Sequence, residues 1–145
     1  MKPMIDHIHI TVTDLARAEV FYDKLLPLLG FDLSLKEYDE VPKHEYRIVE
    51  YHHAMLSIGL VNQRSAYENE KPSRRKGGAL HHIAFRADSP EKVESLYKII
   101  RDLPAEIIHE PRYYPDYCKD YYAFFFKDSE GTEIEIVCFD RRSYY

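Results

Sequence analysis

Two stretches of this chain repeat each other at a spacing of 75 residues, from His7 to His82. The first stretch is Asp6-His7-Ile8-His9-Ile10-Thr11-Val12-Thr13-Asp14-Leu15, and the second is His81-His82-Ile83-Ala84-Phe85-Arg86-Ala87-Asp88-Ser89-Pro90. Each predicts a strand with a histidine near its start, followed by an Asp or Ser that can cap a helix. A duplicated fold is therefore expected, with the two histidines in equivalent places.

Hydrophobic periodicity predicts the same order of elements after each copy. In the first half we expect a strand at 5–12, a helix from Asp14 that stops at Pro27 and Gly30, a strand at 31–36, a loop at 38–43, and strands at 46–51 and 54–61. In the second half we expect a strand at 80–86, a helix capped by Ser89, a strand at 106–109, a tyrosine- and proline-rich loop at 110–120, and strands at 121–126 and 132–139.

This order defines an α+β fold made of two βαβββ modules with mixed sheets. We expect one domain over residues 1–145, with a first module at about 4–61, a polar linker at 62–78 and a second module at about 79–140. The 145 residues, of which 45% are hydrophobic, suffice to bury the core of such a domain.

Composition and charge limit the kinds of binding partner and the cellular compartment that we expect. The net charge of −5 argues against general nucleic-acid binding, which needs a basic face. Neither a membrane-spanning run nor a signal-peptide core is found, so a cytoplasmic protein without a membrane partner is expected. The two cysteines, Cys118 and Cys138, lie too far apart for a metal or redox CxxC motif.

Three metal-ligating side chains share faces that the predicted helices leave uncovered. Alternation in the strands places His7, His82 and Glu135 on these faces, opposite the apolar side chains. If the two faces turn toward each other, two imidazoles and a carboxylate converge. This set, with coordination positions left open, suits Fe(II), Mn(II), Ni(II) or Zn(II). Each histidine alone is more often a hydrogen-bonded surface or core residue than a ligand.

The chain resembles the vicinal oxygen chelate (VOC) superfamily, which includes glyoxalase I, fosfomycin-resistance proteins, bleomycin-binding proteins and extradiol dioxygenases. The segments that carry the resemblance are 6–10 with Asp14-Leu15 and Phe21-Tyr22, then His82-Ile83-Ala84-Phe85, and finally Asp128-Ser129-Glu130-Gly131-Thr132-Glu133-Ile134-Glu135. The last is similar to the family ending D-P-D-G-x-x-I-E. The resemblance implies that the paired sheets form a cup-shaped half-barrel with the helices outside.

The resemblance also implies that His7, His82 and Glu135 lie where family members hold one divalent metal ion. His9 is the alternative to His7 as the first metal ligand, and the spacing to Asp14-Leu15 favours His7. Counting along the modules matches Ser57 with Glu135, and four-ligand members carry Glu or Gln at this place. Serine is a poor metal ligand and cannot be the carboxylate base that removes a proton in the glyoxalase I reaction. The three-ligand pattern therefore matches the fosfomycin-resistance and dioxygenase branches better than glyoxalase I.

Several functions remain open on these grounds. A metal-dependent enzyme would use the metal as a Lewis acid on a small, oxygen-rich substrate, in a glyoxalase-like isomerisation, an epoxide opening or a dioxygenation. The alternative is a metal-free sequestration protein of the bleomycin-resistance type, and the filled triad favours the enzyme. His9, Ser57, Arg86 and Tyr121 are expected to line the substrate pocket, with Arg86 contacting an anionic group. Relatives with two such modules suggest a homodimer.

Overall fold

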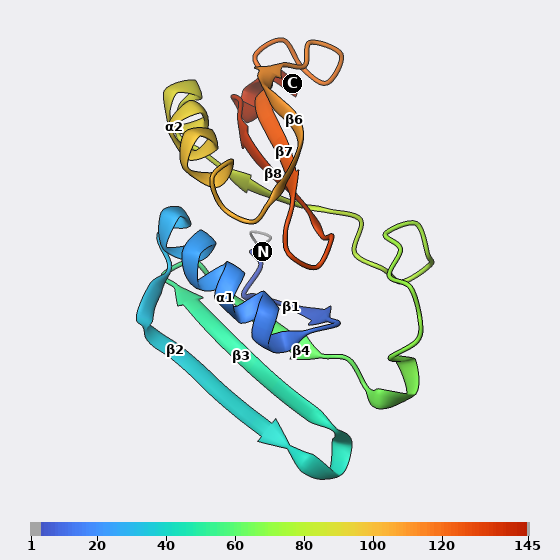
Figure 1. The fold of residues 1–145 in the computed structure, drawn as a ribbon. Coiled ribbons are helices and arrows are strands. Elements are labelled where there is room, and N and C mark those ends of the chain that lie inside the picture. Colours follow the sequence, from blue (N-terminus) through green and yellow to red (C-terminus); the bar gives the residue numbers. More distant parts are fainter. Residues whose placement is uncertain (1–3, 145) are drawn as a thin grey trace. The chain divides into compact units, whose positions relative to one another are not determined.

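The computed structural model describes residues 4–144 and divides into two compact units, one ending at Pro72 and one beginning at Ser73 (Figure 1). Each unit contains a strand, a helix and three further strands, in that order. Each forms one four-stranded sheet in which the first strand pairs in parallel with the last, and the remaining pairs are antiparallel. The predicted α+β class, with two βαβββ units and mixed sheets, is confirmed.

The sheet of the first unit has the strand order β1-β4-β3-β2. Its elements are β1 (His7–Val12), α1 (Leu15–Leu25), β2 (Asp32–Val41), β3 (Tyr46–His53) and β4 (Leu56–Asn62), with short 3-10 helices at Leu26–Leu29, Pro42–His44 and Ser65–Tyr67. As Figure 1 shows, α1 lies along one face of this sheet. The opposite face of the unit carries His7 and His9.

Sequence-local signals account for α1. The Asp14 side chain accepts a hydrogen bond from the Arg17 backbone N–H at 3.0 Å, which caps the helix as predicted. Gly30 follows with a φ of 94°, a left-handed conformation that glycine adopts without steric cost. The side chains that α1 buries against the sheet are Ala18, Phe21, Tyr22 and Leu25.

The strands β2 and β3 are longer than predicted. The loop expected at 38–43 is mostly strand, because β2 continues to Val41 and the chain turns only at Pro42–His44. His52 and His53, which fall between the expected strands 46–51 and 54–61, belong to β3. The added residues pair with β3, from Glu37 opposite Glu50 to Val41 opposite Tyr46. Just before them, Lys36 on β2 donates to Glu19 and Asp23 of α1 at 2.8 and 2.9 Å, which ties the strand to the helix.

The second unit has the strand order β5-β8-β7-β6. Its elements are β5 (Ile83–Arg86), α2 (Pro90–Ile100), β6 (Glu106–Tyr113), β7 (Tyr122–Lys127) and β8 (Glu133–Cys138), with a 3-10 helix at Arg141–Tyr144. The Ser89 hydroxyl caps α2 by accepting from the Lys92 N–H at 3.2 Å, and Pro90 occupies the first turn, as predicted. The strand β5 begins only at Ile83, so His82 immediately precedes it.

Both faces of the second sheet are packed. Val93, Leu96 and Ile100 of α2 are buried on the helix side. On the other side Ala123, Phe125 and Val137 form a small buried cluster, against which Ile108, Tyr114, Tyr121 and Phe139 pack. The strand β6 extends into the segment 110–120 that was expected to be loop, reaching Tyr113. None of the helices within residues 4–144 is long and apolar enough to cross a membrane.

Candidate functional site

The second unit brings three of the predicted site residues together around a buried carboxylate. Glu135 on β8 is only 2% exposed. Its Oε1 accepts a hydrogen bond of 2.5 Å from the Tyr121 hydroxyl, and its Oε2 lies 3.7 Å from Nε2 of His82. The His82 Nδ1 in turn lies 2.8 Å from Nδ1 of His81. In the tautomer that donates this bond from His82 Nδ1, the lone pair of Nε2 faces Glu135.

The surroundings of Glu135 change its acidity and that of its partner. Burial raises the pKa of Glu135, while the Tyr121 hydroxyl and His82 act in the opposite direction without cancelling the effect. Burial and the bond to Glu135 raise the pKa of Tyr121, which therefore stays a hydrogen-bond donor. One carboxylate oxygen is thus held by Tyr121, and the other is directed toward His82.

Arg86 already has partners within its own unit. Its Nη2 donates to the Phe139 carbonyl at 2.7 Å, and its guanidinium lies 5.3 Å from the centre of the Phe139 ring. These contacts attach the chain after β8 to β5. Arg86 is exposed, and its expected contact with an anionic substrate stays a prediction.

The first unit gathers a second set of polar side chains on the face opposite α1. His7 pairs in register with Ser57, and Ser57 with His52; the Ser57 hydroxyl and Nδ1 of His52 are 2.7 Å apart. His9 pairs with Gly59, and its Nε2 lies 3.1 Å from Oε1 of Glu50 on β3. The three expected residues His7, His9 and Ser57 therefore share one sheet face.

Strand register corrects the match between Ser57 and Glu135. Glu135 pairs with Ala84, which lies two residues after His82, whereas Ser57 pairs with His7 itself. The partner of His9, the residue two after His7, is Gly59. The first-unit counterpart of Glu135 is therefore Gly59. The count failed because it accepted Ser57, 50 residues after His7, as the match for Glu135, 53 residues after His82, whereas Gly59 lies 52 residues after His7. Aligning Ile58-Gly59-Leu60 with Ile134-Glu135-Ile136 would have found it.

The structure also shows a potential metal-ligand group that the sequence reasoning missed. Glu37, Glu50 and His52 each offer one ligand atom, and these atoms all lie within 4.8 Å of one another. Glu37 was missed because it falls at the junction between the expected strand 31–36 and the expected loop 38–43. Its register partner Glu50 belongs to a strand whose alternation does place Glu50 and His52 on one face.

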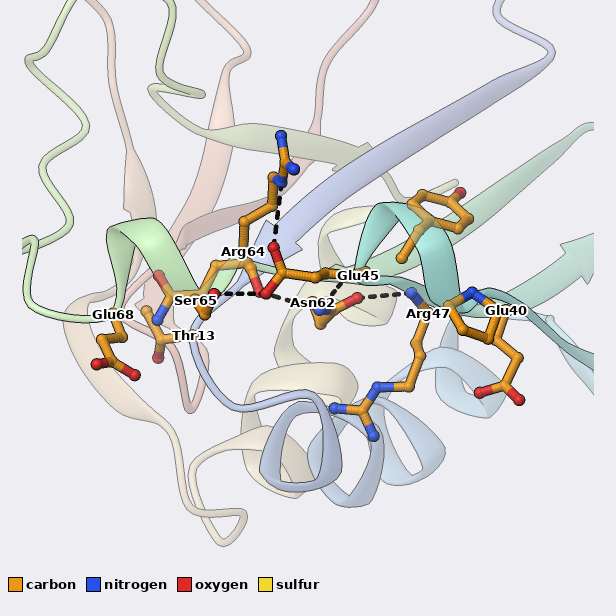
Figure 2. A pocket seen from close by; sticks show the side chains of 11 residues that line it. Thr13, Glu40, Glu45, Arg47, Asn62, Arg64, Ser65 and Glu68 are labelled. Atoms are coloured by element: carbon orange, nitrogen blue, oxygen red, sulfur yellow. Dashed lines mark hydrogen bonds and ion pairs between the residues drawn. The ribbon is translucent and has the colours of Figure 1, made fainter.

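A hollow of about 470 Å³ lies at the C-terminal ends of the parallel strands β1 and β4 (Figure 2). His7 and Ser57 lie near the N-terminal ends of these strands. The polar groups of the hollow join the β2–β3 turn to the segment after β4: Asn62 accepts from the Arg47 N–H at 2.6 Å and donates to the Glu45 carbonyl at 2.8 Å, while Ser65 and Arg64 contact the Glu45 carboxylate. None of the predicted site residues lines this hollow. We assign these contacts to the stability of the turn.

The two βαβββ units have the same strand order, so the chain falls in the class of proteins built by duplication of a βαβββ module. The family description "Glyoxalase/Bleomycin resistance protein/Dioxygenase superfamily" matches residues 4–136. The chain belongs to this superfamily. A comparison with curated proteins found no match.

Solved structures with the same fold cover nearly the whole chain. A candidate glyoxalase from Bacillus halodurans is 26% identical, with a TM-score of 0.73, over 94% of this chain and 96% of that one. A glyoxalase family protein from Enterococcus faecalis is 17% identical, with a TM-score of 0.70, over 94% and 97%. The fosfomycin resistance protein FosX from Listeria monocytogenes, solved with Mn(II) and sulfate, is 17% identical, with a TM-score of 0.65, over 99% and 98%.

Proposed function

We propose that the protein is a divalent-metal-dependent enzyme of this superfamily, with His7, His82 and Glu135 as the metal ligands. The observation that carries the proposal is the environment of Glu135, a buried carboxylate beside an imidazole on a sheet face that α2 does not cover. Removing a carboxylate from water is costly unless it is paired, hydrogen-bonded or bound to a metal. Tyr121 satisfies one oxygen, which leaves the other available as a ligand.

The donor set fits a first-row divalent ion. Imidazole nitrogen and carboxylate oxygen bind Zn(II), Mn(II), Fe(II) and Ni(II), and three protein ligands leave open positions for a substrate. The contacts from Tyr121 to Glu135 and from His81 to His82 are of the kind that orients ligands from outside the coordination sphere. FosX, which has this fold, was solved with Mn(II), and this supports the choice of a metal enzyme.

The chemistry follows from the ligands and from what the first unit lacks. A bound metal would act as a Lewis acid on a small substrate with neighbouring oxygen atoms. In the first unit the counterpart of Glu135 is Gly59, which supplies neither a fourth ligand nor a carboxylate base. The proposed reactions are accordingly epoxide opening or dioxygenation in preference to a glyoxalase I isomerisation, with Arg86 and Tyr121 near the substrate.

We further propose a homodimer, in which His7 of one chain can complete the site formed by His82 and Glu135 of another. Mixing inactive His7→Ala and Glu135→Gln chains tests this arrangement. Activity that returns on mixing supports a shared site, whereas activity that stays absent, with mixed dimers detected by mass spectrometry, argues for a site within one chain.

A metal-free binding protein is the second candidate, favoured by the many aromatic rings near Glu135. Tyr114, Tyr117 and Tyr121 contact one another, with ring centres 5.2 to 6.3 Å apart. Such rings offer a surface on which a planar ligand can stack. This candidate predicts ligand binding that does not change when a chelator is added.

Metal analysis separates the two candidates. Chains prepared without added metal, and then titrated with Mn(II) or Zn(II), should bind the metal, and His82→Ala and Glu135→Gln should lower the affinity by tenfold or more. The exposed histidine on the β2–β3 turn gives a matched control, and His44→Ala should have no effect. Binding of neither metal, or binding unchanged by both substitutions, would reject the metal-dependent enzyme.

A further inference from the structure

We propose that Glu37, Glu50 and His52 form a second divalent-metal site within the first unit. These residues lie on β2 and β3, and none of them is among the ligands His7, His82 and Glu135 of the proposed function. The inference does not depend on that function. It rests on four features of the first unit: ligand spacing, charge, and the contacts of His52 and of Glu50.

The spacing of the ligand atoms suits a small metal ion. Glu37 and Glu50 are register partners on adjacent antiparallel strands, so their side chains leave the sheet on the same face. Oε2 of Glu37 lies 3.4 Å from Nε2 of His52, and one donor atom of each of the three residues lies within 4.8 Å of the others. Ligands at about 2.0 to 2.2 Å from a tetrahedral Zn(II) are separated by about 3.3 to 3.6 Å. A small inward movement, chiefly of the exposed Glu37 carboxylate, therefore completes the geometry.

The charges of the site call for a cation. Two carboxylates placed directly opposite each other across a strand pair repel. The partners that the structure gives them are His9 for Glu50 and His52 for Glu37. When both imidazoles are neutral, as metal binding to His52 requires, the two carboxylates carry two negative charges, and a divalent ion balances them. The Glu37 side chain is 73% exposed, so an ion can enter from solvent.

The contact between Ser57 and His52 prepares the imidazole for binding. When His52 Nδ1 donates its proton to the Ser57 hydroxyl at 2.7 Å, the lone pair is placed on Nε2, the nitrogen that faces Glu37. A ligating histidine commonly donates its other N–H to a neighbouring polar group, which fixes the tautomer and the ring orientation. Ser57 thus orients a ligand here, although it is a poor ligand itself.

His9 orients the second ligand, Glu50, in a similar way. In the tautomer protonated at Nε2, His9 donates to Oε1 of Glu50 at 3.1 Å and leaves Oε2 free for a metal. This contact crosses β4 at Gly59, where a Cβ would come 2.6 Å from the His9 ring. The glycine provides the space through which His9 reaches Glu50. Two ligands therefore have orienting partners on β1 and β4.

Mixed carboxylate and imidazole ligands indicate the kind of metal. Two oxygens and one nitrogen suit Zn(II) or Mn(II) and are a poor match for Ca(II), which takes six to eight oxygens. Three protein ligands also leave at least one position for water or another small ligand. Co(II) replaces Zn(II) in such sites and provides an absorption signal.

The test uses the full chain carrying Glu135→Gln, so that the metal site of the proposed function loses its carboxylate ligand. Titration with Zn(II), and with Co(II) followed by its visible absorption, should show one bound ion per chain. Adding His52→Ala or Glu50→Gln should lower the affinity at least 100-fold, and Ser57→Ala should lower it about 10- to 100-fold through loss of orientation. His44→Ala, a control on the same hairpin, should leave binding unchanged.

The outcomes separate the two metal sites. If the Glu135→Gln chain binds neither ion, or if both His52→Ala and Glu50→Gln leave its affinity unchanged, the second site is overturned. An ion that is retained in Glu135→Gln and lost with either substitution supports it, whether or not wild-type protein binds a further ion through His7, His82 and Glu135. Circular dichroism of Glu50→Gln, which preserves side-chain size, checks that a lost ion does not reflect unfolding.

Discussion

The imidazole of His9 fills the space that a side chain at position 59 would occupy: a Cβ on residue 59 would lie 2.6 Å from Cδ2 of His9. His9 thereby reaches across β4 to Glu50 on β3. In the second unit the equivalent row runs from Ala84 through Glu135 to Phe125. The carboxylate of the row is therefore Glu50 on β3 in the first unit and Glu135 on β8, the last strand, in the second unit.

Gly59→Ala should destabilise the protein by about 1 to 3 kcal/mol, the usual cost of forcing a methyl group into filled space. The new methyl would overlap the His9 ring and would also lie 2.8 Å from Cδ1 of Ile48. Urea unfolding followed by circular dichroism measures the loss. In a His9→Ala background the same substitution should cost less, because one of the two obstacles is gone. Equal costs in both backgrounds would show that the ring of His9 is not the obstacle.

Lys36→Met should also lower the free energy of unfolding, by about 1 to 3 kcal/mol, because Glu19 and Asp23 would lose a charged donor. The Lys36 side chain is only 15% exposed, and its ammonium group joins β2 to α1. Lys24→Met is a suitable control, since Lys24 is an exposed lysine in the last turn of α1. A loss no greater than that of the control, in the same urea experiment, would count against a structural role for the ion pair.

Stability should fall as the pH rises above about 10, and Tyr51 should account for part of the fall. Burial, and then the hydrogen bond to Asp23, raise the pKa of Tyr51 above its ordinary value of 10.0. Above that value the unfolded chain releases a proton that the folded chain retains, so the folded state loses stability. The pKa of Lys36 is raised as well, because its hydrogen bonds to Glu19, Tyr38 and Asp23 outweigh its burial, and this acts in the same direction.

Tyr51→Phe isolates the tyrosine. The substitution should destabilise the protein at pH 8 by about 0.5 to 1.5 kcal/mol, through loss of the bond to Asp23. The difference between variant and wild type should shrink at pH 11, where the wild type bears the cost of keeping Tyr51 protonated. Urea unfolding at both pH values measures this. A difference that is constant or grows with pH contradicts the assignment.

Local patterns were sufficient to predict the duplicated fold, because alternation, helical periodicity and the caps at Asp14 and Ser89 act over a few residues. They also predicted that Tyr121, His82 and Glu135 matter, although the contacts among these residues depend on strand register. The position of Glu37 and the role of Gly59 could not be predicted in this way. Both depend on a neighbouring strand: residues 37–41 belong to β2 because they pair with β3, and Gly59 matters because His9 of β1 lies over it.

Asp128 gives a final prediction, since it holds the turn after which β8, with Glu135, begins. Asp128 is buried, and its Oδ1 accepts hydrogen bonds of 2.8 Å from the backbone N–H groups of both Glu130 and Thr132. Asp128→Ala should cost about 2 to 4 kcal/mol, because two backbone donors would lose their acceptor. Asp128→Asn keeps an oxygen in the same place and should cost about 1 kcal/mol or less. Thermal and urea unfolding measure both variants. If Asn is as damaging as Ala, the charge of Asp128 matters more than the two hydrogen bonds, and the turn is held by electrostatic attraction instead.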